Sequence, residues 1–380
     1  MAHTLAQIWL SLQSSLFPAL GECLPEPVTQ KQKQLVTILE IVRIEEHVES
    51  PFRQGMGRPE CDRRSLARAF VVKAVYNLPQ TDLLIEMLKL QPNLRQLCGW
   101  ERFSQVPSAS TFSRSFAEFA ADGLGDRVHA ALVKQHVGDL PVMHISRDST
   151  EVIAREKATK KDKSAVDKSA VEAQEPAKEP KKRGRPKKGE VRPPPEPKRL
   201  DTQLEQSAEE ALAQLPKTCD WGTKMDTGGH KHTWKGWKAH IDWADGSLPI
   251  SVVTTSASVH DSQVAIPLAR MTAERVTSLY ELMDSAYDAP QIRQVSQELE
   301  HVALIDPNPR RGGVPEEKQF DPAMKRRYRE RSTAERGNSR LKDSFGLRHL
   351  RVRGHNKAHL HIMFGILCVF ADQLMKPFRC

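Results

Sequence analysis

Apolar residues in the first third of the chain recur with helical spacing. Two strongly apolar segments, residues 35–44 and 66–78, are followed by two shorter amphipathic patterns that start near Thr81 and Ser110. Thr and Ser are common N-cap residues, so both positions are consistent with helix starts. We therefore predict an all-α N-terminal domain over residues 1–135.

The last two of these helices have the order of a helix-turn-helix. In that motif the second helix would present Ser113 and Arg114 to a DNA major groove. A string of short helices is more often simply packed into a core, and the pattern alone leaves both interpretations open.

The pattern then changes to that of a sheet. Residues 140–146 form a short apolar strand that ends near Asp148. Residues 235–243 alternate between apolar and polar, the turn dipeptide Asp245-Gly246 follows, and residues 248–255 are apolar and β-branched. A turn dipeptide between two such runs predicts a β-hairpin.

Helices and strands alternate after the hairpin. The expected elements are helices over 200–215, 260–275 and 290–300, strands over 279–283 and 301–305, a charged helix around 328–343 and a final apolar helix over 360–374. Three strands followed by alternation predict an α/β fold, a mixed sheet flanked by helices. The order is that of a ribonuclease-H-like domain, formed by residues 136–155 and 200–380.

Residues 156–199 interrupt this domain after its first strand. The segment contains seven prolines and no aromatic residue, Leu, Ile or Met, so it cannot bury a core and we expect it to be disordered. Its Arg183-Gly184-Arg185-Pro186 sequence resembles an AT-hook, in which Arg183 and Arg185 would enter an A·T-rich minor groove. A solvated lysine-rich linker would have the same composition.

The positive charge is concentrated in two places. The 380-residue chain has a net charge of +9. Residues 156–199 hold 15 Lys and Arg against 8 Asp and Glu, and residues 325–353 hold 11 against 3. The rest of the chain is therefore acidic, with a net charge of 9 − 7 − 8 = −6. Such local positive charge indicates a polyanionic partner.

Cysteine spacing and hydropathy exclude several classes of protein. None of the six cysteines forms a C-x-x-C pair, so we expect neither a zinc site nor a disulfide framework, and a reducing cytosol fits. The longest apolar run, near residues 362–371, is too short to span a bilayer. The first 20 residues lack a basic start and predict an amphipathic helix, not a signal peptide.

One stripe of functional side chains lies on the charged helix. Tyr328, Arg331, Glu335 and Lys342 are spaced by three, four and seven residues. At about 100° per residue they share one helix face about 21 Å long. A solvated face with an Arg331–Glu335 pair would give the same spacing. Gly337 within the stripe costs up to ~1 kcal/mol of helix propensity.

Three acids stand out by their positions. Asp148 and Asp284 each follow an apolar strand, and Glu335 lies on the helix after the last strand. In a mixed sheet these carboxylates would converge, and converging carboxylates need cations to offset their repulsion. Two Mg²⁺ ions are the expected partners, because Mg²⁺ prefers oxygen ligands and a metal pair activates phosphodiesters.

These residues resemble a known family. The Tyr328, Arg331, Glu335 and Lys342 spacing resembles the signature of DDE transposases of bacterial insertion sequences, in the insertion-sequence-four-like superfamily. Asp148 in "ISRDST" and Asp284 in "LMDSAYDA" resemble the first two catalytic aspartates of that family. The resemblance covers about residues 60–150 and 218–375.

The resemblance implies a function. Asp148, Asp284 and Glu335 would bind two Mg²⁺ ions, for which Mn²⁺ can substitute, while Tyr328, Arg331 and Lys342 contact DNA. The enzyme would cut double-stranded DNA at transposon ends and join the freed 3′-OH to target DNA. It would work as a homodimer on paired ends, with an N-terminal domain for end binding or dimerisation. A cytoplasmic bacterial protein associated with the nucleoid, with no membrane contact, is implied.

Two features depart from the family pattern. Only 51 residues separate Asp284 from Glu335, too few for the β insertion of some relatives, which leaves open whether a hairpin intermediate forms and how a flipped base would be held. Residues 156–199 are an addition.

Two alternatives to an active transposase stay open: a catalytically inactive, domesticated DNA-binding relative, and a stand-alone nuclease. The intact acids and signature argue against the first, and a nuclease has no need of Tyr328 and Lys342.

Other candidate residues have simpler explanations. The histidines at 230, 232 and 240, and those at 355, 359 and 361, are interpreted as ordinary polar residues, because imidazoles on polar loops usually do not bind a metal. Trp234 and Trp237 fit core packing better than base stacking. The remaining acids are interpreted as helix caps or turns: Asp261, Asp288 and Asp306.

Overall fold

The computed structural model describes residues 28–49, 61–138, 140–158, 197–225, 228–307 and 319–376. The predicted N-terminal amphipathic helix lies outside these residues, as do Arg183, Arg185 and most of the predicted disordered segment. No helix in the described ranges is long and apolar enough to cross a membrane.

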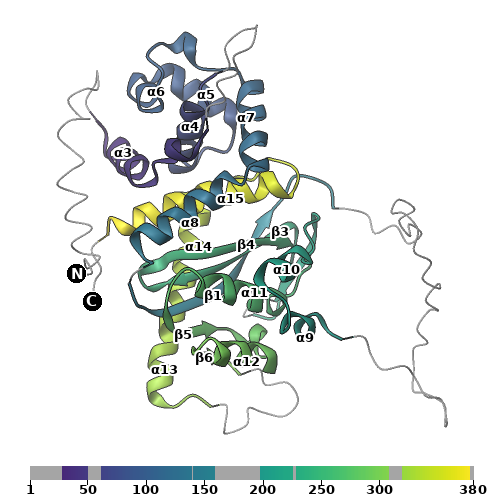
Figure 1. The fold of residues 1–380 in the computed structure, drawn as a ribbon. Helices are drawn as coiled ribbons and strands as arrows, with labels where there is room; N and C mark the ends of the chain where they lie inside the picture. Colours follow the sequence, from purple (N-terminus) through teal and green to yellow (C-terminus); the bar gives the residue numbers. More distant parts are fainter. Residues whose placement is uncertain are drawn as a thin grey trace, which may run out of the picture.

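The N-terminal part is all-helical, as predicted (Figure 1). Its α-helices are α3 (Gln30–Val42), α4 (Arg63–Val75), α5 (Thr81–Leu90), α6 (Pro92–Cys98), α7 (Ala109–Ala121) and α8 (Leu124–His136). Thr29 caps α3 in a capping box with Gln32, and Asp62 accepts two backbone N–H bonds at the start of α4. The two predicted caps were wrong by one or two residues, because Gln80 precedes α5 and Ser108 precedes α7.

The rest of the fold is one mixed sheet with helices around it. Its strands are β1 (Val142–Ile153), β2 (Asp220–Met225), β3 (Lys231–Ala244), β4 (Leu248–Ser256), β5 (Ser278–Met283) and β6 (Val302–Ile305). The order is β2-β3-β1-β5-β6, and β4 also pairs with β3. Strands β1, β3 and β4 pair antiparallel, whereas β1, β5 and β6 pair parallel. The predicted α/β class and mixed sheet are confirmed.

Several sequence-based boundaries were wrong. Strand β1 continues to Ile153, because residues up to 153 pair with β3, so Asp148 lies within the strand and not at its end. Strand β2 was not predicted, because its apolar pattern is weak and its pairing with β3 comes from tertiary contact. The predicted helix over residues 200–215 is broken into α9 (Arg199–Gln203) and α10 (Ala208–Ala213), and Ser207 caps the second.

The two faces of the sheet carry different helices. On one face α14 (Ser332–Ser344) packs with Gly337 against Trp243 of β3. On the other face, Thr272 of α11 (Ser262–Ala273) donates a hydrogen bond to Asp242. Helix α12 (Pro290–Glu298) packs against β6, and Figure 1 shows the two elements side by side. Because neighbouring residues of a strand point to opposite faces, Arg147 and Asp148 belong to these two environments.

Helix α15 (His355–Leu374) joins the N-terminal helices to the sheet. It contacts α3, α4, α7 and α8 as well as β4. In Figure 1 it lies between the sheet and the helices α3, α4 and α7. Phe364 of α15 lies against Phe70 and Phe116, with ring centroids 5.5 and 6.1 Å away. The hydrophobic core is therefore continuous across the expected domain boundary at residue 135.

Candidate active site

A single guanidinium lies among the three predicted acids. Arg331 Nη1 is 2.7 Å from Glu335 Oε1, and Arg331 Nη2 is 3.7 Å from Asp284 Oδ2 and 4.0 Å from Asp148 Oδ1. The structure thus brings together Asp148, Asp284 and Glu335 around Arg331. Three formal negative charges face Arg331 and the nearby Lys224, so the cluster keeps a net negative charge.

Strand pairing brings the two aspartates together. Ser146 of β1 is in register with Leu282 of the parallel strand β5, so Asp148 and Asp284 each lie two residues further along adjacent strands. Asp284 follows the last residue of β5, as predicted, and its carboxylate accepts the backbone N–H of Ala286 at 2.9 Å. This bond fixes the Asp284 side chain at the end of the strand.

Helix α14 brings the third acid to the sheet. Gly337 lies so close to the sheet that a Cβ at this position would be 2.6 Å from the Trp243 ring. The helix propensity lost at this glycine therefore permits close packing. The next residue, Asn338, donates from Nδ2 to Asp148 Oδ2 at 2.9 Å. Glu335, one turn earlier, is 62% exposed at the open side of the cluster.

Burial and like charge act on the two aspartates. Burial, together with the Asp284 carboxylate, raises the pKa of Asp148 to about 6 despite the opposing influence of Arg331. The pKa of Asp284 is also raised, mainly by burial. Ionisation of both carboxylates is therefore unfavourable in free energy, and a bound cation would offset this.

The other two signature residues contact protein groups. Tyr328 donates from its hydroxyl to the Met283 carbonyl at 3.2 Å, and burial raises its pKa. Lys342 Nζ is 3.1 Å from Glu151 Oε1, at the far end of the stripe. The stripe is helical but not one regular α-helix, because the 3₁₀ turn Arg329–Arg331 separates α13 (Pro322–Tyr328) from α14.

Three polar residues of this region were missed by sequence reasoning. Asn338 and Glu151 contact Asp148 and Lys342, and nothing in their local sequence marks them. Asp261 was interpreted as a helix cap, but its side chain makes no cap hydrogen bond. Instead it pairs with Lys238 at 2.9 Å and contributes repulsion that raises the pKa of Asp284. Its position next to the N-terminus of α11 was the only available signal.

The rival candidates are explained by packing and pairing. Trp234 and Trp237 are buried, which confirms the core interpretation. Asp288 does not cap α12, because Ala289 holds that position; Asp288 pairs with Arg293 at 3.2 Å. Within the described ranges, no three His, Cys, Asp or Glu side chains lie close enough together to share a metal ion.

The donor set nevertheless fits hard divalent cations. All three acids offer carboxylate oxygens, and the buried Oδ1 of Asn338 lacks a hydrogen-bond partner in the described part of the chain. Arg331 now provides the positive charge that such ions would supply. Its place between the acids also explains why they are not already close enough to share an ion.

Comparisons with known families give the site its context. Residues 158–371 match the family model described as Transposase DDE domain, which is more than half of the 380 residues. Residues 24–118 match the model described as Transposase domain (DUF772). Asp284 and Glu335 lie inside the DDE match, and Asp148 lies shortly before it. Comparisons with curated proteins and with solved structures gave no match. The chain therefore belongs to the family of transposases that carry a DDE domain.

Proposed function

We propose that this transposase cleaves DNA at transposon ends and transfers the strand to target DNA, with Asp148, Asp284 and Glu335 as its metal-binding acids. The observation that carries the proposal is the cluster of three carboxylates around Arg331, at 2.7, 3.7 and 4.0 Å. The three acids outnumber Arg331 and the nearby Lys224, and this leaves a negative charge suited to metal ions.

Strand order supports a ribonuclease-H-like assignment. Without β2, the order is β4-β3-β1-β5-β6, with the first three strands antiparallel and the last two parallel to β1. The spacing of Tyr328, Arg331, Glu335 and Lys342 supports membership in the insertion-sequence-four-like superfamily.

The chemistry follows from the donor set. Two Mg²⁺ ions, or Mn²⁺ in their place, would be held by Asp148, Asp284 and Glu335 and would supply Lewis-acid charge at the scissile phosphodiester. In the first reaction a water oxygen forms a bond to phosphorus and the bond to the 3′ oxygen breaks, so the leaving group becomes a free 3′-OH. In the second, that 3′-OH forms the new P–O bond and a target-strand 3′ oxygen leaves.

The chain's own residues prepare the site. Asn338 holds one oxygen of Asp148 by its amide, which leaves the other oxygen directed at Arg331. Because Arg331 lies between the acids, we propose that its guanidinium moves to a DNA phosphate when the site is loaded. Tyr328 is held at the end of β5 by Met283, and Lys342 lies two turns along the helix from Glu335, so both flank the site on the path proposed for DNA.

The proposed substrates are double-stranded transposon ends and target DNA. A homodimer that pairs two ends is the proposed assembly, since both ends of an element must be cut and joined together. The N-terminal helices and the AT-hook-like Arg183 and Arg185 are proposed to add DNA contacts outside the acid site.

The test is cleavage of DNA that carries the sequences flanking the coding region. We expect nicking at the element boundary with Mg²⁺ but not with EDTA, and a loss of at least about 10³-fold in rate for Glu335→Gln. Asp343→Asn, which changes an exposed acid on the same helix, is the matched control and should cleave normally. DNA binding without cleavage by the unmodified protein would instead leave the inactive-relative interpretation.

A further inference from the structure

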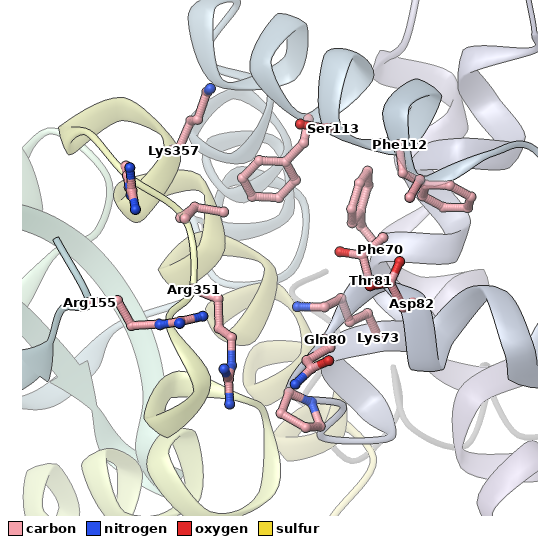
Figure 2. A pocket seen from close by; sticks show the side chains of 15 residues that line it. Phe70, Lys73, Gln80, Thr81, Asp82, Phe112, Ser113, Arg155, Arg351 and Lys357 are labelled. Carbon is pink, nitrogen blue, oxygen red and sulfur yellow. The ribbon is translucent and has the colours of Figure 1, made fainter.

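A cationic cleft lies apart from the acid cluster. Its volume is about 580 Å³, and it lies between the N-terminal helices and the segment that leads into α15 (Figure 2). Five basic residues line it: Lys73, Arg155, Arg351, Arg353 and Lys357. They come from α4, from the chain after β1, and from the region at the start of α15. Three segments that are distant in the sequence thus contribute positive charge to one cleft.

The positive charge of this cleft is not matched by acids. Of the described residues that line it, only Asp82 is acidic. None of the five basic side chains forms an ion pair with a carboxylate of the described part of the chain. The nearby Glu156 accepts the backbone N–H of Gly354 at 2.7 Å. The five cations outnumber Asp82 and the adjacent Glu156, and this excess of positive charge favours an anionic ligand.

Lys73 shows how strongly the cleft is polarised. Figure 2 shows Lys73 and Arg155 on opposite sides of Arg351. Burial, together with the charge of Arg351, lowers the pKa of Lys73 to about 8. A half-buried ammonium group beside a guanidinium destabilises the free protein, and a bound anion would reduce this cost.

The floor of the cleft is apolar. Phe70, Phe112 and Phe116 line it, and all three are buried. Because these rings are buried, the cations are the groups that a ligand reaches, and they fit the phosphate oxygens of a phosphodiester. Phosphate contacts of this kind position DNA without reading its sequence.

Strand β1 and helix α14 connect the cleft to the acid cluster. Along β1, Asp148 contacts Asn338 and Glu151 contacts Lys342, so α14 runs beside the strand in the same direction. Arg155 lies two residues after the end of the strand. The seven residues from Asp148 to Arg155 span about 23 Å of extended chain. At about 3.4 Å per nucleotide, that distance corresponds to roughly seven nucleotides along B-DNA.

We propose that this cleft binds the DNA sugar-phosphate backbone about seven nucleotides from the phosphate held at the acid cluster. The proposal rests on the proposed function, because it takes the acid cluster as the place of the scissile phosphate. The DNA backbone would then pass Arg331, Lys342 and the basic residues of the cleft in that order. The cleft fixes the register of the DNA on the enzyme, and the acids act on the phosphate that this register selects.

The first test measures binding to a 40-base-pair duplex from the flanking sequence, in the Glu335→Gln background, by fluorescence anisotropy at several salt concentrations. We expect Arg351→Ala/Arg353→Ala to make the slope of log K against log salt shallower by about 2. Lys217→Ala/Lys376→Ala removes two exposed cations that lie outside both the cleft and the N-terminal helices, and it should leave the slope unchanged. An equal slope for the cleft variant and the unmodified chain would overturn the proposal.

A second variant guards against misfolding. Lys73→Met keeps the aliphatic stem and removes the half-buried charge, so it should raise the melting temperature of the free protein and weaken DNA binding. A variant that binds DNA as tightly as the unmodified chain would contradict the proposal. Stabilisation by inorganic phosphate with an unchanged DNA salt slope would assign the cleft to a free anion and would also overturn it.

A third test locates the contact. Single neutral methylphosphonates are placed along each strand, and two positions of weakened binding are expected about seven nucleotides apart. The Arg351→Ala/Arg353→Ala variant should lose one of them and Arg331→Ala the other. If the slope and the interference pattern follow this expectation while the unmodified chain fails to cleave, the cleft stands and the proposed function fails. If the unmodified chain cleaves DNA while the salt slope of the cleft variant is unchanged, the proposed function stands and the cleft proposal fails.

Discussion

Arg147 and Arg331 each lie among carboxylates on opposite faces of the same strand, β1. Arg147 is buried, with two hydrogen bonds of 2.8 Å to Asp242 and one of 3.0 Å to Glu281. Arg331 has one close partner, Glu335 at 2.7 Å, and two aspartates at 3.7 and 4.0 Å. Adjacent residues of one strand, Arg147 and Asp148, thus belong to a closed ion network and to an open one.

The two networks respond to pH in opposite directions. Arg147, with help from Ser296 and His301, outweighs the effect of burial and holds the pKa of Glu281 well below its usual range. Glu281 therefore adds stability above its ordinary pKa, and this stability is lost as the pH falls. The pKa of Asp148 is raised to about 6, so the ionisation of Asp148 costs stability as the pH rises from about 4 to about 6. The first network stabilises the fold, and the second stores an unfavourable charge that a ligand can relieve.

The largest expected effect comes from breaking the closed network. Arg147→Met would leave Asp242 and Glu281 buried without their cation, which should lower the free energy of unfolding by about 3–5 kcal/mol. Arg331→Met, at the open site, should lower it by less in EDTA, because Glu335 is exposed and Asp148 can take up a proton. Urea unfolding at pH 7.5 measures the free energy of unfolding of both variants. Equal losses would show that Arg331 is as structural as Arg147.

Removing charge from the open network should stabilise the protein. Asp148→Asn abolishes the cost of a buried carboxylate, so the free energy of unfolding without metal should rise by about 1–3 kcal/mol at pH 7.5. The gain should vanish below about pH 3, where Asp148 is mostly protonated in both the folded and the unfolded state. Added Mg²⁺ should stabilise the unmodified protein more than the variant. A loss of stability that is the same at both pH values would contradict this interpretation.

The smallest effect concerns the helix that closes the open site. Gly337→Ala gains about 1 kcal/mol of helix propensity but places a Cβ 2.6 Å from the Trp243 ring, and overpacking costs about 1–3 kcal/mol. We expect a net loss of about 1 kcal/mol by urea unfolding. Ser339→Ala, on the exposed side of the same helix, should stay within about 0.5 kcal/mol. A clear stabilisation by Gly337→Ala would mean that α14 does not pack tightly on the sheet.

Local pattern predicted much of the fold but not its pairings. The apolar period predicted α4 and α15, and the Asp245-Gly246 turn predicted the β3–β4 hairpin. The length of β1 was underestimated, because its second half carries Arg147, Asp148 and Glu151 and looks too polar for a strand. Only pairing with β3 on one side and packing of α14 above it make that polar half a strand.

The same division holds for the site. Asp284 could be found because it follows an apolar strand, and Glu335 because it lies on a charged helix. Both are features of the local sequence. Asn338 and Glu151 could not be found in this way, because they act through residues about 190 positions away in the chain. The cationic cleft is of the same kind, since its basic residues come from three separate segments.

Most helices and strands, the charge of each segment and the residues able to do chemistry could be predicted from the amino-acid order alone. These follow from side-chain polarity and spacing, which act over a few residues. Tertiary structure alone decided that Arg331 lies between the three acids, that Gly337 is needed against Trp243, and that Lys73 and Arg351 share a cleft. Distances of a few ångströms between side chains distant in the sequence depend on how β1, α14 and α15 pack, and packing is a property of the whole folded chain.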